Sequence, residues 1–115
     1  MARLYLIGPV TGKPNNNLEE FERVRKLLEE QGDQVDIPHD FVDPRVCWQS
    51  AMLVSIHKLT EFETHLHCKP YEYHPHYDGV AMLEGINNSK GARLEKQIAE
   101  TLGIPCLFWH DYIRW

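Results

Sequence analysis

The chain has 115 residues, 43% of them apolar, and its 12 basic and 17 acidic side chains leave a formal net charge of −5. This length supports one hydrophobic core and the composition is that of a soluble globular protein, so we expect a single domain over residues 1–115. Lysine and arginine never exceed two adjacent residues, which argues against duplex nucleic acid as a partner.

The chain opens on an apolar run at 4–7 (LYLI) without the pattern of a signal peptide. No apolar run approaches the roughly 20 residues that span a bilayer. The three cysteines, Cys47, Cys68 and Cys106, are odd in number and widely spaced, as is typical of reduced thiols. We therefore expect a cytoplasmic protein with no membrane partner.

The first half of the chain predicts one βαβ unit. Residues 3–7 form a short apolar strand, and 8–14 form a glycine- and proline-rich loop. A helix over about 18–31 follows, with Asn15 to Asn17 as N-caps and Gly32 as its stop. A second short strand covers 34–37. The helix has its apolar residues at helical spacing: Leu18, Phe21, Val24, Leu27 and Leu28.

The second half continues the alternation of helix and strand. We expect a helix over about 46–62 with Trp48, Met52, Ile56 and Leu59 on one face, as core or oligomer contacts. A buried strand at 79–83, a helix over about 90–102 and a strand at 105–108 follow. The pattern predicts an α/β three-layer sandwich, Rossmann-like or flavodoxin-like, with a mostly parallel sheet of four to five strands. The glycine loops at 8–14 and 85–91 would lie at the ligand-binding edge.

A histidine- and tyrosine-rich insertion at about 63–77 interrupts this pattern. It carries His65, His67, Cys68, His74 and His76, but their spacing matches no common structural zinc site. We expect no metal and no cofactor, and interpret the segment as a polar surface or interface loop. A zinc site remains an alternative, as does a histidine at the mouth of the active site.

The run at 89–95 (SKGARLE) indicates a binding site. A small-residue turn that leads into a helix can hold an anionic or hydroxylated group at the helix N-terminus, and Glu95 would point at that group. Two simpler interpretations stay open. Ser89 would then be only the N-cap of its helix, and Glu95 an exposed carboxylate paired with Arg93 or Lys96.

Two motifs together resemble the nucleoside 2-deoxyribosyltransferase superfamily. The first is 5–12 (YLIGPVTG), followed by an asparagine-rich segment and Phe21. The second comprises Asp78, 82–85 (MLEG), 89–95, Ala99 and 102–105 (LGIP). They cover most of the chain except 62–77 and are closest to the small phage and bacterial branch. This branch is similar to deoxynucleoside 5′-monophosphate N-glycosidases.

The resemblance implies cleavage or exchange of the N-glycosidic bond of 2-deoxyribonucleosides or their 5′-monophosphates, through a covalent deoxyribosyl intermediate on Glu95. Tyr5 matches the tyrosine that orients this carboxylate, and Asp78 an aspartate that handles the base or its departure. Ser89 occupies the position that binds the 5′ end of the sugar. The implied substrate-binding residues are Gly8, Pro9, Thr11, Gly12, Gly85, Ser89, Gly91 and Ala92.

The residue at the 5′ position bears on the substrate. Free-nucleoside transferases of the superfamily tend to have an acid there, and nucleotide hydrolases tend to have a serine. Serine accepts a phosphate where an aspartate would repel it, so Ser89 favours a 5′-monophosphate substrate. Ile86 stands where the superfamily often has an aromatic residue, a candidate for stacking on the base.

Other interpretations of the same residues stay open. Tyr5 could be a half-buried strand residue and Asp78 a turn residue. The chain could be a nucleotide-binding module without turnover, or an interaction protein that uses the histidine-rich segment. The resemblance also implies a homo-oligomer, with a neighbouring chain completing the pocket, in the host cytoplasm if the chain is phage-encoded.

Overall fold

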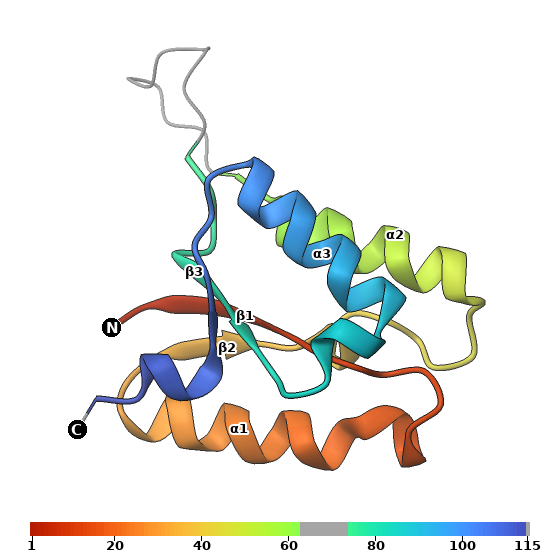
Figure 1. Cartoon of the computed structure of the whole chain (residues 1–115), viewed down its shortest axis with the longest axis horizontal. Helices are drawn as coiled ribbons and strands as arrows, with labels where there is room; N and C mark the ends of the chain where they lie inside the picture. Colours follow the sequence, from red (N-terminus) through yellow and green to blue (C-terminus); the bar gives the residue numbers. More distant parts are fainter. Residues whose placement is uncertain (63–73, 115) are drawn as a thin grey trace.

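The computed structural model describes residues 1–62 and 74–114. Its four strands form one parallel sheet in the order β2-β1-β3-β4 (Figure 1). The strands are β1 (Arg3–Ile7), β2 (Gln34–Asp36), β3 (Gly79–Met82) and β4 (Cys106–Phe108). The α-helices are α1 (Leu18–Glu30), α2 (Trp48–Leu59) and α3 (Lys90–Thr101). Four short 3₁₀ helices are η1 (Pro14–Asn17), η2 (Pro38–Asp40), η3 (Ile86–Asn88) and η4 (Trp109–Tyr112).

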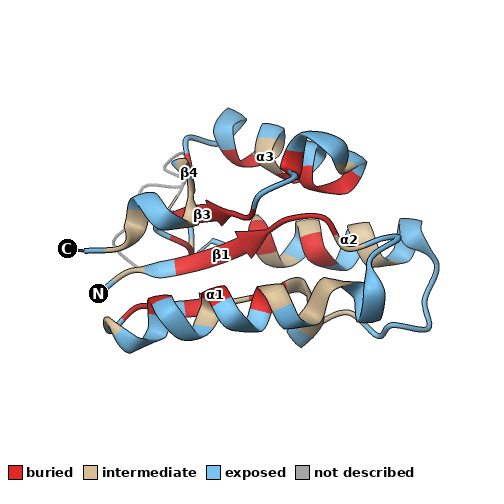
Figure 2. Cartoon of the chain, turned by 60° about the horizontal axis from the view of Figure 1, so that its bottom comes forward, coloured by how far each residue is buried: buried red, intermediate tan, exposed pale blue. Residues whose placement is uncertain are grey.

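The helices cover both faces of the sheet. Helix α1 lies on one face, and α2 and α3 lie together on the other (Figures 1 and 2). The expected α/β three-layer architecture, Rossmann-like with a parallel sheet, is therefore confirmed, with four strands. The strand order 2-1-3-4 places β2 and β3 on opposite sides of β1. The carboxyl ends of β1 and β3 thus form a topological switch point, where sheets of this kind bind ligands.

The central strands are buried on both faces (Figure 2). Their side chains point alternately to the two faces of the sheet, and helices cover each face. In β1, Leu4 and Leu6 pack with the buried face of α1. Tyr5 and Ile7 point to the other face, into the core that Ala92 and Ala99 of α3 share. The strand-like runs of the sequence are continuous in apolar residues for this reason, as expected for a parallel sheet between two helical layers.

Of the histidine-rich insertion, the structure describes the end, residues 74–77. Its last residue, Tyr77, is 1% exposed, and its hydroxyl donates a hydrogen bond of 2.7 Å to Asp36 Oδ2 at the end of β2. The Tyr77 ring also packs edge-on against Tyr5, at 5.1 Å between centroids. The return from the insertion is therefore anchored in the core. His65, His67 and Cys68 lie outside the described residues.

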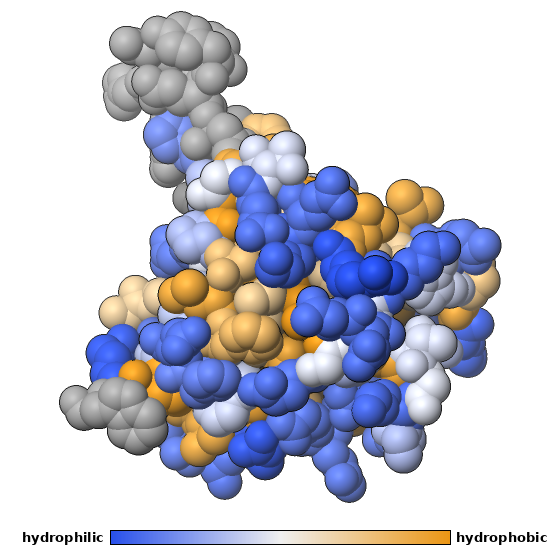
Figure 3. All heavy atoms as spheres, in the orientation of Figure 1, coloured by the Kyte–Doolittle hydropathy of each residue, from blue (hydrophilic) through white to orange (hydrophobic). Residues whose placement is uncertain are grey.

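In the orientation of Figure 1, the surface carries polar side chains over both helical layers, with apolar surface between them (Figure 3). No described helix combines the length and apolarity needed to cross a membrane. Within residues 1–62 and 74–114, no three or more His, Cys, Asp and Glu side chains are grouped to hold a metal ion.

Gly8, directly after β1, has no room for a side chain. A Cβ there would lie 2.7 Å from Leu83 Cβ, an atom fixed by the backbone next to β3. We expect Gly8→Ala to lower the free energy of unfolding by about 1–3 kcal/mol, because one chain segment must move. Urea unfolding measures the change. Gly91→Ala is the matched control, since its Cβ would meet the flexible Met52 side chain. Equal losses in both variants would contradict this explanation.

Candidate functional site

A cavity of about 250 Å³ opens at the carboxyl edge of the sheet, beside the switch point between β1 and β3. It lies between the loop after β1, the segment from η2 to α2, and the first turns of α3. An adjoining cavity of about 350 Å³ shares Thr11, Trp48, Ser89 and Gly91 with the first. Together they reach the size of pockets that bind small molecules, roughly 300–1,000 Å³.

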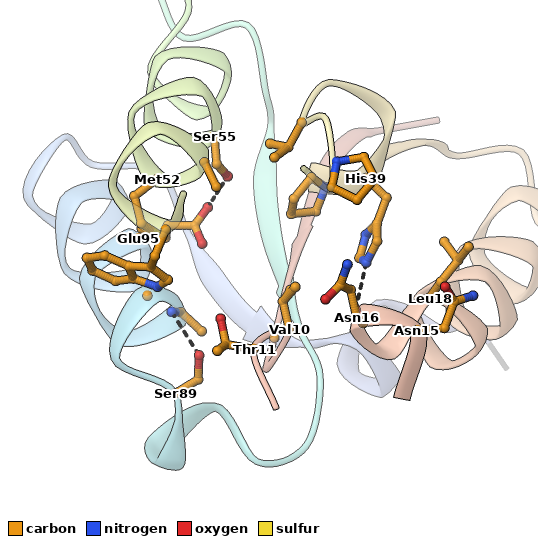
Figure 4. Close-up of a pocket in the computed structure, with 18 residues that line it drawn as sticks. Val10, Thr11, Asn15, Asn16, Leu18, His39, Met52, Ser55, Ser89 and Glu95 are labelled. Carbon is orange, nitrogen blue, oxygen red and sulfur yellow. Dashed lines mark hydrogen bonds between the residues drawn. The ribbon is translucent and has the colours of Figure 1, made fainter. Parts of the chain in front are cut away.

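The first cavity has two opposed walls (Figure 4). Met52 and Ser55 of α2 and Glu95 of α3 form one wall, and His39 stands on the other. Figure 4 shows Ser55 and Glu95 pointing toward each other, with Thr11 of the β1–α1 loop between the walls. A ligand in this cavity would lie directly against the carboxylate.

Glu95 is a buried carboxylate, with only 5% of its surface exposed. Burial raises its pKa from the ordinary value of 4.5 to about 7, and the hydrogen bond from Ser55 opposes this rise. No cation pairs with Glu95 among the described residues. The alternative of an exposed carboxylate paired with Arg93 or Lys96 does not describe this geometry, since Lys96 instead pairs with Glu100 at 3.2 Å.

Three side chains from three elements form a hydrogen-bonded chain behind the cavity. The Ser55 hydroxyl donates to Glu95 Oε2 at 2.6 Å, and Tyr5 Oη lies 2.7 Å from Ser55 Oγ. Tyr5 is fully buried, and burial together with the nearby Glu95 raises the pKa of its hydroxyl well above the ordinary value. The tyrosine therefore stays protonated and can act as a donor throughout the neutral range.

The raised pKa of Glu95 predicts how stability depends on pH. Between pH 4.5 and about 7 the folded state keeps a proton that the unfolded state has released, so folding favours the protonated form there. Relative to Glu95→Gln, the wild-type free energy of unfolding should fall by about 2–3 kcal/mol between about pH 5 and pH 8. Denaturant unfolding of both proteins measures this difference. Parallel pH profiles would show that the carboxyl is not held in its protonated form.

The first turn of α3 meets both cavities. Ser89 Oγ accepts a hydrogen bond of 3.2 Å from Ala92 N, so Ser89 is the N-cap that the sequence predicts. Lys13 and Lys90 line the adjoining cavity together with Ser89. The positive end of the helix and two lysines thus surround one opening, an arrangement that attracts anions.

The wall opposite Glu95 contains unusual backbone. Asn15, Asn16 and Asn17 have φ of 48°, 54° and 63°. This left-handed conformation is easy for glycine, and among other residues asparagine tolerates it best. His39 Nε2 lies 2.8 Å from the carbonyl oxygen of Asn16, which fixes Nε2 as a donor. Asn17 occupies the predicted N-cap position of α1, but its side chain donates to the Pro9 carbonyl oxygen at 2.9 Å and makes no capping hydrogen bond. Asn15 and Asn16 line the cavity.

The structure brings most of the predicted site residues together, and it separates Asp78 from them. Asp78 precedes β3 at the amino edge of the sheet, opposite the cavity, and accepts a hydrogen bond of 2.8 Å from Arg3 N. Tyr5 reaches the site only through Ser55, and Gly12 lies in an exposed turn with φ of 83°. The predicted residues that line one or both cavities are Gly8, Pro9, Thr11, Gly85, Ser89, Gly91, Ala92 and Glu95.

Ser55 is the site residue that the sequence analysis missed. The sequence pattern predicts Ile56 on one face with Trp48, Met52 and Leu59, as core or oligomer contacts, whereas Ser55 is the buried residue and Ile56 is half-buried. The signal was present, since positions 48, 52, 55 and 59 also fall on one helical face. A single hydroxyl within an otherwise apolar turn marks a buried position with a polar partner. His39 was missed because nothing in its local sequence distinguishes it.

Comparison with known proteins supplies one relationship. The family model described as "Domain of unknown function (DUF4406)" matches residues 2–108. No curated protein matches the chain. The matched range contains all of the cavity residues, together with the Tyr5–Ser55–Glu95 chain. Because the match extends over most of its length, the chain belongs to the DUF4406 family.

Proposed function

We propose that the protein cleaves the N-glycosidic bond of a 2′-deoxyribonucleoside 5′-monophosphate, by hydrolysis or by transfer of the deoxyribosyl group to another base. The observation that carries this proposal is the buried Glu95 carboxylate in the cavity wall, one side of a pocket whose other end opens at the N-terminus of α3. The resemblance to the nucleoside 2-deoxyribosyltransferase superfamily supplies the reaction class, and the parallel α/β fold is consistent with it.

The proposed chemistry has two displacements at the anomeric carbon. A Glu95 oxygen forms a bond to this carbon while the carbon–nitrogen bond breaks, and the electron pair leaves with the base, which takes up a proton. Water or a second base then attacks the same carbon and gives up a proton to solvent, while the bond from this carbon to the Glu95 oxygen breaks and releases the carboxylate. A carboxylate stabilises the oxocarbenium-like transition states of both steps. The nucleophile must be ionised, so a pKa of about 7 makes the rate rise with pH through neutrality.

The adjoining cavity supports a phosphorylated substrate. Lys13, Lys90 and the Ser89 N-cap surround it, so a 5′-phosphate there would meet two positive charges and the first amides of α3. Trp48 lies between the two cavities with 37% of its surface exposed, and Lys90 Nζ is 5.1 Å from its ring centroid. This wall would hold the deoxyribose phosphate while the base faces His39.

The leaving base needs a proton donor other than Asp78. Asp78 lies at the amino edge of the sheet, so the role that the superfamily resemblance implies for it does not fit its position. His39 and Glu95 are the titratable side chains that line the first cavity, and they stand on opposite walls. His39 Nε2 already donates to the Asn16 carbonyl oxygen and Nδ1 is buried, so we propose that water in the cavity, rather than His39 itself, protonates the departing base.

A second function remains, and the position of Asp78 favours it. A nucleotide-binding module needs the same cavity and the same anion-binding opening, but it needs no acid for a leaving group. One assay separates the two functions. The purified protein is incubated with each deoxynucleoside and deoxynucleotide, with and without an acceptor base, and free base is measured by chromatography. Base release supports the enzyme, whereas tight binding without release across the panel would leave the binding module.

Helix α2 carries exposed apolar side chains that could contact a second copy of the chain. Besides Trp48, which lines both cavities, the exposed apolar side chains of α2 are Leu53, exposed by 70%, and Val54, exposed by 38%, on a helix whose other side carries cavity residues. Apolar surface of this kind is suited to contact with another chain. We propose that the protein acts as a homo-oligomer that uses this side of α2.

A further inference from the structure

We propose that Ser55 is the positioning residue of the carboxylate. It binds Glu95 Oε2 and is itself held by Tyr5, so Tyr5 acts on the carboxylate through Ser55. Glu95 Oε1 is left as the atom that attacks the anomeric carbon. This inference rests on the proposed function and refines it. The superfamily resemblance implies only that Tyr5 orients the carboxylate, and in this structure a hydroxyl of helix α2 stands between the two groups.

The direction of the hydrogen bonds follows from their chemistry. An ionised carboxylate only accepts, so the Ser55 proton is donated to Glu95 Oε2 over 2.6 Å. Ser55 Oγ is then free to accept, and the Tyr5 hydroxyl at 2.7 Å is the donor. Both Tyr5 and Ser55 are buried, at 0% and 4% exposed, so water competes little for either hydrogen bond.

The two carboxylate oxygens are therefore unequal. Oε2 is occupied by Ser55, while Oε1 has no hydrogen-bond partner within residues 1–62 and 74–114, and Glu95 lines the cavity. A hydrogen bond from Ser55 lowers the nucleophilicity of the oxygen that receives it. The same bond fixes the plane of the carboxylate, so that the other oxygen faces a ligand in one orientation.

Among the groups around Glu95, Ser55 is the one that favours the ionised form of its carboxyl. The titratable groups that face it are Tyr5 from β1 and His39 from η2 across the cavity, and Lys90, at the start of α3, lies over Trp48. Burial favours the protonated form of Glu95, and the bond from Ser55 acts against it. Removal of the Ser55 hydroxyl should therefore make the carboxyl harder to ionise.

The experiment follows the ¹³C resonance of the Glu95 carboxyl against pH in the ligand-free protein, with Glu95→Gln to assign it. We expect Ser55→Ala to raise the midpoint of this titration by about one pH unit or more, and Tyr5→Phe to raise it by less. The double variant should titrate like Ser55→Ala alone, because Tyr5 acts through Ser55. Ser55→Thr keeps a hydroxyl and should restore a midpoint close to that of the wild type.

Two results would overturn the inference. One is an unchanged Glu95 titration in Ser55→Ala. The other is a shift in Tyr5→Phe that equals or exceeds that of Ser55→Ala and persists in the double variant, which would mean a direct contact between Tyr5 and Glu95. Tyr5→Phe removes one oxygen atom, and an unchanged Glu95 titration in this variant would overturn the proposed link from Tyr5 to the carboxylate even where Ser55→Ala is too unstable to study.

Kinetics on the released base tests the catalytic half of the inference. Ser55→Ala should lower kcat at neutral pH by about tenfold or more, leave KM nearly unchanged, and move the rising limb of the pH–rate profile to higher pH. A rise in KM with kcat unchanged would show that Ser55 contacts the substrate instead. If the wild type releases no base from any substrate, the proposed function fails, whereas the carboxyl titration still decides whether Ser55 positions Glu95.

Discussion

Replacement of Glu95 by glutamine should abolish the release of free base, with a loss in kcat of about a thousandfold or more, because an amide cannot form the glycosyl ester. Glutamine has nearly the same shape and still offers an oxygen to the Ser55 hydroxyl. The variant should therefore fold, and it should bind the deoxynucleotide with an affinity close to that of the wild type. Chromatographic rates and calorimetric titration measure the two effects separately.

A matched control comes from the same helix. Glu100 is exposed on the outer side of α3, where it pairs with Lys96 at 3.2 Å. Glu100→Gln makes the same chemical change outside the cavity and should keep full activity. Base release that survives in Glu95→Gln would remove this carboxylate as the nucleophile. Loss of activity in both variants would point to a general effect of charge on the helix.

The layered architecture was predictable because each element carries its own signal. Strands that are apolar on both faces alternate with amphipathic helices, and only a parallel sheet between two helical layers buries both patterns. The glycine loops after β1 and β3 then identify the ligand-binding edge, since all parallel strands end there. Ser89 and Glu95 could be placed at this edge from the sequence because both belong to the helix that follows β3.

The rest depended on contacts between distant segments. Asp78 is the exception, because its place could have been read from the sequence: it precedes β3, so it lies at the edge of the sheet opposite the cavity. Ser55 and Tyr5 are fifty residues apart and meet only because α2 crosses back over β1. The rotation of α2 about its axis, which puts Ser55 inward and Ile56 half outward, is set by packing against α3. There, Gly91 lets Met52 approach closely.

Replacement of Ser89 by aspartate should change the preferred substrate from the monophosphate to the free nucleoside. Aspartate remains a good N-cap for α3, so the helix and the fold should be retained. Its charge, however, would face the phosphate in the opening between Lys13 and Lys90. Two like charges about 4 Å apart near a protein surface repel by on the order of 1–4 kcal/mol, so kcat/KM for the monophosphate should fall by a factor of about 5 to 1,000.

The comparison that isolates charge is Ser89→Asn, which matches aspartate in shape and also caps helices, but is neutral. If repulsion is the cause, Ser89→Asn should keep its preference for the monophosphate, and added salt should partly restore the activity of Ser89→Asp. If both variants lose monophosphate cleavage equally, shape at this position matters and charge does not. Faster cleavage of the free nucleoside than of the monophosphate by the wild type would remove the phosphate from this opening altogether. The adjoining cavity would then have to hold another part of the substrate, and Lys13 and Lys90 would have no anion to bind there.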